Sequence, residues 1–186
     1  MQRIGILGYG EIGRAIHKVY DASGGDYQVL VKDIARDDGL IDIDVLNVSI
    51  PYNQNFNFVD EVVKITKQSS AKMVIVHSTV AVGTTRLIKE TLGADFVVAH
   101  SPCRGVHPNL YEGIMTFLKY VGSPLETDAK LVEEHLKNVG ITTHVCKNSE
   151  SSELAKLLDT SYYGICIAYH GEAEKACQLL LAERMG

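Results

Sequence analysis

The sequence predicts an α/β fold with a mostly parallel, doubly wound sheet and a long C-terminal helix. Short apolar runs typical of buried strands alternate, as far as residue 145, with segments whose apolar residues recur at helical spacing. From about residue 151 the helical spacing continues alone, without a proline. Repeated strand-then-helix units favour a parallel sheet with helices on both faces.

Seven strands are expected in the first part of the chain, with helices between most of them. The expected strands are residues 4–7, 27–31, 43–50, 73–76, 96–99, 117–121 and 141–145. Residues 101–113 are expected to form a loop, because they contain two prolines and two glycines. Thr84 and Thr85 are expected to cap the helix that follows them.

The C-terminal segment is expected to form one helix. Ser151-Ser152-Glu153 is a typical helix start, and apolar residues recur at helical spacing as far as Leu180. Two shorter helices, broken at Gly164 or Gly171, are the alternative, but no other turn-forming residue accompanies either glycine. We therefore divide the chain into a domain of residues 1–148 and a helix of residues 149–186.

Composition limits the class of protein. The chain has 186 residues, of which 46% are hydrophobic and 22% charged, enough for one large domain with its own core. A net charge of −5 and a pI near 5.8 argue against a nucleic-acid partner. No apolar run is long enough to cross a membrane. The four cysteines form no CxxC pair and the chain begins with a strand pattern, so we expect no signal peptide, reduced thiols and a cytoplasmic protein.

A glycine-rich turn after the first strand gives the main indication of function. Its sequence is Gly8-Tyr9-Gly10-Glu11-Ile12-Gly13. Gly8 permits a tight turn, Gly10 leaves room for a pyrophosphate, and Gly13 lets the next helix pack closely on the strand. The helix N-terminus then offers N–H groups and a partial positive charge to the phosphates. This arrangement predicts a dinucleotide-binding domain of the Rossmann type.

An acidic residue in the expected place supports this prediction. Asp33 follows the second strand, twenty residues after Gly13, where a carboxylate can accept hydrogen bonds from the adenosine ribose. Asp33 favours NAD, although Lys32 and Arg36 leave NADP open, since a cation there could meet a 2′-phosphate. We expect NAD to lie across the strand ends. The further cofactor-binding residues expected there are Ser49, Pro51, Ser78 and Thr79.

Three later segments resemble motifs of the UDP-glucose/GDP-mannose 6-dehydrogenases. Residues 78–85, STVAVGTT, resemble the STVPVGTT segment of that family. Residues 100–105, HSPCRG, stand where the family has its SPER-type loop, and residues 153–158, ELAKLL, resemble its AEL-x-K-L motif on a central helix. The resemblance covers most of this chain but only the N-terminal part of the enzymes of that family. It implies a truncated form with the NAD-binding domain and the central helix.

The resemblance implies catalytic roles for matching residues. Thr79 should lie near the nicotinamide and the reacting carbon, and Lys156 should stabilise an oxyanion or position water. Cys103 replaces the loop glutamate of the family, and Thr160 replaces the asparagine that usually follows the lysine. The family's catalytic cysteine and its aspartate partner belong to a domain that this sequence does not contain.

Cys103 is a further candidate for catalysis. It is expected to border the cofactor cleft, where His100 or His107 could activate its thiol. The alternative is a loop cysteine without a catalytic role. We predict no metal site, because His100, Cys103 and His107 supply three ligands and no clear fourth.

These observations predict an NAD-dependent oxidoreductase acting on a CH–OH group. The substrate would be a nucleotide sugar or another small alcohol, and complete two-step oxidation is not expected of the chain alone. A catalytically inactive NAD-binding or assembly module that needs a partner chain is the alternative. The large apolar residues of the C-terminal helix exceed what one small domain can cover. We therefore expect a homodimer through this helix, which the resemblance also implies.

Overall fold

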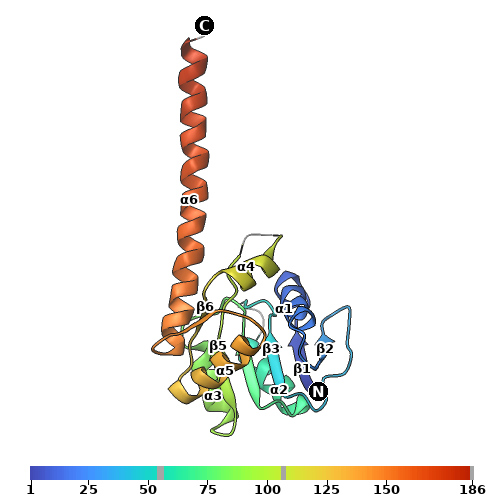
Figure 1. Ribbon diagram of the computed structural model, residues 1–186. Coiled ribbons are helices and arrows are strands. Elements are labelled where there is room, and N and C mark those ends of the chain that lie inside the picture. Colours follow the sequence, from blue (N-terminus) through green and yellow to red (C-terminus); the bar gives the residue numbers. More distant parts are fainter. Residues whose placement is uncertain (54–56, 106–107, 185–186) are drawn as a thin grey trace. The chain divides into compact units, whose positions relative to one another are not determined.

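The computed structural model describes residues 1–53, 57–105 and 108–184, which form seven strands and six helices (Figure 1). The strands are β1 (Gln2–Leu7), β2 (Tyr27–Lys32), β3 (Val45–Val48), β4 (Met73–Val76), β5 (Val97–His100), β6 (Lys119–Val121) and β7 (Thr143–Val145). The helices are α1 (Glu11–Ala22), α2 (Phe58–Ser69), α3 (Thr84–Leu92), α4 (Leu110–Thr116), α5 (Glu126–Asn138) and α6 (Ser149–Arg184). The chain divides into two compact units, Met1–Leu154 and Ala155–Gly186, so the division falls inside α6.

The first unit is built on a five-stranded parallel sheet in the order β2-β1-β3-β4-β5. β1 is paired on both edges, since Gly5 lies opposite Leu30 of β2 and Leu46 of β3. The chain therefore leaves β1 toward one edge of the sheet and later returns to the other. The predicted α/β class with a mostly parallel sheet is confirmed.

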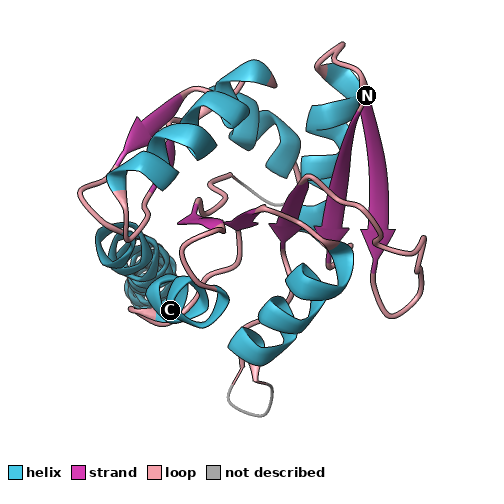
Figure 2. Ribbon diagram, turned by 90° about the horizontal axis from the view of Figure 1, so that it is seen from below, coloured by secondary structure: helices cyan, strands magenta, loops and turns pink. Residues whose placement is uncertain are grey.

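Two clusters of buried apolar residues cover the two faces of this sheet. Successive residues of a strand point to opposite faces, so Val45 belongs to one cluster and Leu46 to the other. Side chains of α1, α4 and α5 join the first cluster, and those of α2 and α3 join the second. Figure 2 shows helices on both sides of the strands, which is the doubly wound arrangement.

Three local expectations need correction. β6 and β7 pair with each other in a separate two-stranded sheet, and an isolated bridge between His100 and Gly122 joins it to the larger sheet. The expected loop at 101–113 ends early, because α4 begins at Leu110. Its apolar side chains enter the core, which outweighs the nearby proline and glycines.

The expected cap of α3 is also wrong. Its N-cap residue is Gly83, and the hydroxyl of Thr84 donates to the carbonyl of Ala81. The N–H groups of Gly83 and Thr85 donate to the carboxylate of Glu153, which lies near the N-terminus of α6. A distant acid thus replaces the local hydroxyl that the sequence suggested.

A chain of buried polar groups links α1, α5 and the sheet. The Tyr20 hydroxyl lies 2.8 Å from Nε2 of His135 and 3.2 Å from the amide nitrogen of Asn47. His77 continues the chain, with Nε2 2.9 Å from Asn47 Oδ1 and Nδ1 2.8 Å from the carbonyl oxygen of Ser101. Burial lowers the pKa of His135 to about 4, and burial together with the charge of a nearby lysine holds the pKa of His77 well below its usual value.

The second unit is the greater part of α6. The helix runs without a break through Gly164 and Gly171, so the prediction of a single helix is confirmed. Many of its large apolar side chains are exposed, including Tyr162 at 71% and Tyr169 at 70%. No helix of the described residues combines the length and the hydrophobicity that a membrane crossing requires.

Candidate functional site

A cleft of about 430 Å³ opens at the carboxyl ends of β1, β3 and β4. It lies where the strand order reverses on either side of β1, which is where open α/β sheets bind ligands. Its lining residues are Gly10, Glu11, Ile12, Ser49, Ile50, Pro51, Tyr52, Ser78 and Thr79. The structure thus brings together seven of the residues predicted to bind the cofactor.

The three positions of the turn differ in whether the fold requires glycine there. Gly8 has a φ of +92°, and a Cβ there would lie 2.8 Å from the carbonyl oxygen of Ser49. A Cβ on Gly13 would lie only 2.1 Å from the carbonyl oxygen of Gly8. A Cβ on Gly10 would meet nothing within 4 Å, and its φ of −70° suits any residue. The fold therefore requires glycine at positions 8 and 13, whereas position 10 borders open space in the cleft.

The start of α1 faces this open space. Its N-cap residue, Gly10, has no side chain that could accept a hydrogen bond from the first turn. Helix N-termini carry partial positive charge and N–H groups that suit an anion. The cleft therefore has the backbone chemistry of a phosphate site.

Asp33 is tied directly to the glycine turn. Its carboxylate accepts a hydrogen bond of 2.6 Å from the N–H of Tyr9. This bond is the main cause of the lowered pKa of Asp33, and the N–H groups of Ala35 and Ile34 and the charge of Arg14 lower it further. The side chain is therefore a carboxylate at neutral pH, held beside the turn.

The two cations that left NADP open are both paired with neighbouring acids. Arg36 contacts Asp38 at 2.7 Å, and Lys32 is paired with Asp37. The Arg36 guanidinium also lies 5.3 Å from the centre of the Tyr9 ring. The charges next to Asp33 are thus largely balanced within the loop.

Two serines fix the strand ends that line the cleft. The hydroxyl of Ser49 donates to the carbonyl of Gly8 at 2.8 Å, and that of Ser78 donates to the carbonyl of Ile50 at 2.7 Å. These bonds join the ends of β1, β3 and β4. Thr79 follows Ser78 and lies half-buried on the wall of the cleft.

Cys103 does not line this cleft. Its side chain is 5% exposed and packs in the apolar core. The ammonium of the buried Lys119 lies 3.5 Å from its Sγ and donates to the carbonyls of Ser101 and Pro102. These contacts favour the alternative in which Cys103 is a structural residue.

The other predicted residues divide between the two units and the undescribed segments. Lys156 belongs to the second unit, so its place in the site remains a prediction. His107 lies outside the described residues. His100 is buried, with its ring nitrogens 2.9 Å from the Ser152 hydroxyl and 3.2 Å from the Ser78 carbonyl.

Sequence reasoning missed several residues of the site. Ile50 and Tyr52 line the cleft, and their place directly after the third strand could have indicated this. Ile34, next to Asp33, is fully exposed although it is apolar. The role of Glu153 had no local indication, because its partners lie about 70 residues away.

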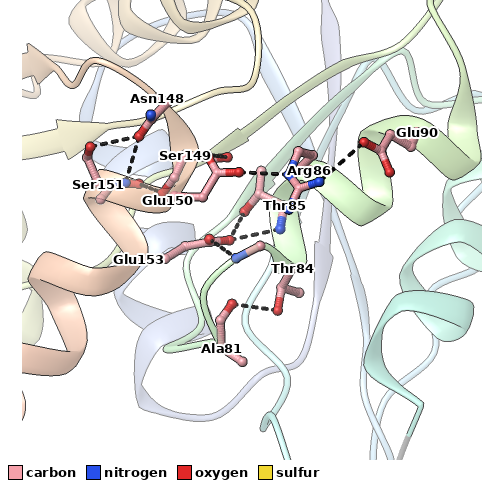
Figure 3. A network of polar contacts seen from close by, with 12 residues as sticks. Ala81, Thr84, Thr85, Arg86, Glu90, Asn148, Ser149, Glu150, Ser151 and Glu153 are labelled. Atoms are coloured by element: carbon pink, nitrogen blue, oxygen red, sulfur yellow. Dashed lines mark hydrogen bonds and ion pairs between the residues drawn. The ribbon is translucent and has the colours of Figure 1, made fainter.

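Glu153 organises a polar network at the start of α3 (Figure 3). Its carboxylate accepts hydrogen bonds from the N–H of Gly83 at 2.7 Å, the N–H of Thr85 at 2.8 Å and the hydroxyl of Thr85 at 2.6 Å. Burial raises the pKa of Glu153, and these three bonds oppose that change. Beside it, Glu150 pairs with Arg86 at 2.8 Å nearer the surface.

Comparison with known proteins finds similarity to dehydrogenases. No family model matches the chain. Two curated proteins from Methanococcus maripaludis, both UDP-N-acetyl-D-mannosamine dehydrogenases, are 27% identical over 105 residues. The match covers 56% of this chain and 25% of each relative.

Solved structures show the same fold. A UDP-D-ManNAc dehydrogenase from Pyrococcus horikoshii aligns with a TM-score of 0.75 and 18% identity, over 87% of this chain and 50% of that one. For a UDP-N-acetyl-mannosamine dehydrogenase from Staphylococcus aureus the TM-score is 0.72 and the identity 16%, over 96% of this chain and 55% of that one. For a GDP-mannose dehydrogenase from Pseudomonas aeruginosa the TM-score is 0.69 and the identity 15%, over 90% of this chain and 51% of that one. These three structures and the two curated relatives are nucleotide-sugar dehydrogenases, as the motifs predicted, and this chain spans about half the length of the three solved structures.

The different environments of Gly13 and Gly10 give a test of the turn. Gly13→Ala should lower the free energy of unfolding by about 1–3 kcal/mol, because the backbone must move to admit the methyl group. Gly10→Ala should change it by no more than about 0.5 kcal/mol. Urea unfolding followed by circular dichroism measures both. Equal stability of the two variants would show that the helix does not pack against the turn as described.

Proposed function

We propose that this protein binds NAD in the cleft and takes part in oxidising an alcohol group of a nucleotide sugar. The observation that carries the proposal is the ionised Asp33 bound to the N–H of Tyr9. It places a carboxylate acceptor beside a glycine turn that opens a helix. A ribose diol and a pyrophosphate are the adjacent groups of a dinucleotide that fit such a pair of sites.

The cleft residues suggest how each part of the cofactor is held. The pyrophosphate would lie against Gly10 at the N-terminus of α1, and the adenosine ribose would bond to Asp33. The exposed Ile34 offers an apolar surface for the adenine ring. Thr79, on the opposite wall, would lie toward the nicotinamide. Bound there, the cofactor would supply the hydride acceptor.

The charges around Asp33 favour NAD over NADP. The carboxylate of Asp33 would repel a 2′-phosphate, whereas it can accept hydrogen bonds from a free 2′-hydroxyl. The nearby cations Arg36 and Lys32 are already engaged by Asp38 and Asp37. Binding of NADP would have to break these ion pairs in addition to placing two anions together.

Cofactor binding can be tested with two substitutions in the turn. Gly10→Val should abolish NAD binding, because its side chain occupies the open space without disturbing the free protein. Asp33→Asn should lower the affinity for NAD by about tenfold, because a charged hydrogen-bond acceptor is lost. It should also reduce the difference between the affinities for NAD and NADP. Isothermal calorimetry with NAD and NADP measures these affinities.

Gly171→Val is the matched control, because a side chain at this helical glycine also meets open space. It should leave NAD affinity unchanged. If Gly10→Val bound NAD with wild-type affinity, the proposed cofactor site would be wrong. If the wild-type protein bound NADP more tightly than NAD, the proposed role of Asp33 in selecting NAD would be wrong.

The proposed chemistry uses the residues to which the motifs assign catalytic roles. Thr79 would contact the reacting end of the substrate, and Lys156 would supply a fixed positive charge for an oxyanion or a water molecule. We give Cys103 no covalent role, since its thiol is buried in the core. The substrate class comes from the relatives, whose names specify nucleotide sugars, and the chain spans only about half the length of the solved ones.

A second candidate function is a catalytically inactive NAD-binding module that acts with a partner chain. The replacement of the family's loop glutamate by a buried Cys103 favours it, because no carboxylate from that position can serve as acid or base. The two candidates share the cofactor site and differ in turnover.

Turnover with nucleotide sugars separates these candidates. We expect the chain alone to bind NAD but to convert UDP-glucose or UDP-N-acetylmannosamine at no significant rate, with at most one slow oxidation. Remote binding energy from the nucleotide half of the substrate, which helps to position the reacting carbon, should be missing. Absorbance of NADH and mass spectrometry of the product give the measurement. Two NADH per sugar acid, lost in Cys103→Ser, would establish a covalent role for Cys103.

We also propose that α6 pairs with α6 of a second copy. An apolar stripe runs along the second unit with spacings of three and four residues that repeat every eleven. Its members are Leu158, Tyr162, Ile165, Tyr169, Ala173, Ala176 and Leu180. An eleven-residue repeat matches the turn of an α-helix closely, so the stripe stays on one face of a nearly straight helix. Burying each large member would stabilise a dimer by about 1.5–3 kcal/mol.

A charge within this stripe should prevent pairing. Tyr169→Glu should shift the mass toward that of a monomer at micromolar concentration, because a carboxylate would be buried between the helices. Gln178→Glu adds the same charge outside the stripe and should leave the mass unchanged. Size-exclusion chromatography with light scattering reports the mass. A monomeric wild-type protein would reject the proposed dimer.

A further inference from the structure

The segment between β4 and α3 carries the part of the cleft proposed for the nicotinamide end of the cofactor. We call residues 78–83 the Thr79 loop. Ser78 and Thr79 line the cleft, whereas Val82 is exposed at 49%. A loop of this length has many conformations unless both of its ends are fixed.

The end of the Thr79 loop at α3 is held by Glu153. Gly83, in the left-handed region with a φ of +94°, begins the helix without a side chain to cap it. Both oxygens of the Glu153 carboxylate take up that function, one accepting from Gly83 and the other from Thr85. A carboxylate at a helix N-terminus gains from the helix dipole and from charge-assisted bonds. This end is therefore fixed by an anion from another helix.

The end of the Thr79 loop at β4 is held by Ser152 through His100. The carbonyl oxygen of Ser78 can only accept a hydrogen bond, so Nε2 of His100, 3.2 Å away, donates to it. Nδ1 lies 2.9 Å from the hydroxyl of Ser152, which donates to the carbonyl of Ser149 at 2.8 Å. His100 is fully buried and Ser152 is 1% exposed, so water does not compete readily for these bonds.

Two consecutive residues near the N-terminus of α6 thus hold the two ends of one loop. We propose that Ser152 and Glu153 are positioning residues, which set the place of Thr79 for the cofactor and the reacting group. This inference rests on the proposed function of the cleft. It also gives the glutamate of the ELAKLL segment a role separate from that of Lys156.

Two neighbouring residues of α6, Glu150 and Ser151, supply matched controls. Glu153→Gln removes the charge and one of the two acceptor oxygens. Glu150→Gln removes a charge three residues earlier, whose carboxylate contacts Arg86 and Ser149 instead of the Thr79 loop. Ser152→Ala removes the contact with His100 and a hydrogen bond within α6 to the carbonyl of Ser149, whereas Ser151→Ala removes a bond to Asn148 near the surface.

Two measurements on the full chain test the inference. Amide hydrogen exchange should become about tenfold faster at Gly83 and Thr85 in Glu153→Gln, with strand amides unchanged. NAD affinity by calorimetry should fall by about tenfold in Glu153→Gln and by a smaller factor in Ser152→Ala. The two control variants should stay within about twofold of wild type in both measurements.

The outcomes separate this inference from the proposed function. If wild type does not bind NAD, the proposed function fails, and the exchange measurement alone decides whether Glu153 fixes the loop. Unchanged exchange in Glu153→Gln would overturn the role of Glu153. Faster exchange with unchanged NAD affinity would show that the loop ends do not position the site. Thr85→Val, which removes only the hydroxyl bond, should act in the same direction with a smaller effect.

Discussion

The change of direction at β1 is the constraint on which the rest of the first unit depends. Because β2 and β3 pair with opposite edges of β1, the segments that leave these strands diverge at their carboxyl ends. The divergence opens a crevice, and α1 must begin at its floor. The contact between Gly13 and the carbonyl of Gly8 fixes that beginning so tightly that no Cβ fits. Cleft, turn and helix N-terminus follow from one choice of strand order.

Local patterns predicted what local physics decides. Strand β4 appears at the predicted residues, and the long helix continues through both glycines as its spacing indicated. The glycine turn and the acid after β2 were predictable because their spacing reflects the geometry of one β-α-β unit. The cleft residues at the strand ends followed, since carboxyl ends of parallel strands share one edge of the sheet.

Long-range contacts account for what the sequence did not predict. Nothing near Thr84 indicates that a glutamate about 70 residues later caps α3. The separate pairing of β6 with β7 also depends on tertiary structure, because their apolar pattern suits either sheet. Cys103 shows the same limit for the site. Its place in the motif suggested a cleft residue, whereas the core and the neighbouring Lys119 enclose its thiol.

The buried polar chain of Tyr20, Asn47, His77 and His135 makes the stability of the fold depend on pH. His135 and His77 keep lower pKa values in the folded protein than in the unfolded chain. As the pH falls below about 6.5, the unfolded chain takes up protons that the folded core does not, so stability declines until the folded pKa is reached, about 4 for His135. In that interval His135 lowers the free energy of unfolding by about 1 kcal/mol per pH unit, and His77 acts in the same direction. The fold is therefore more stable near neutral pH than in mild acid.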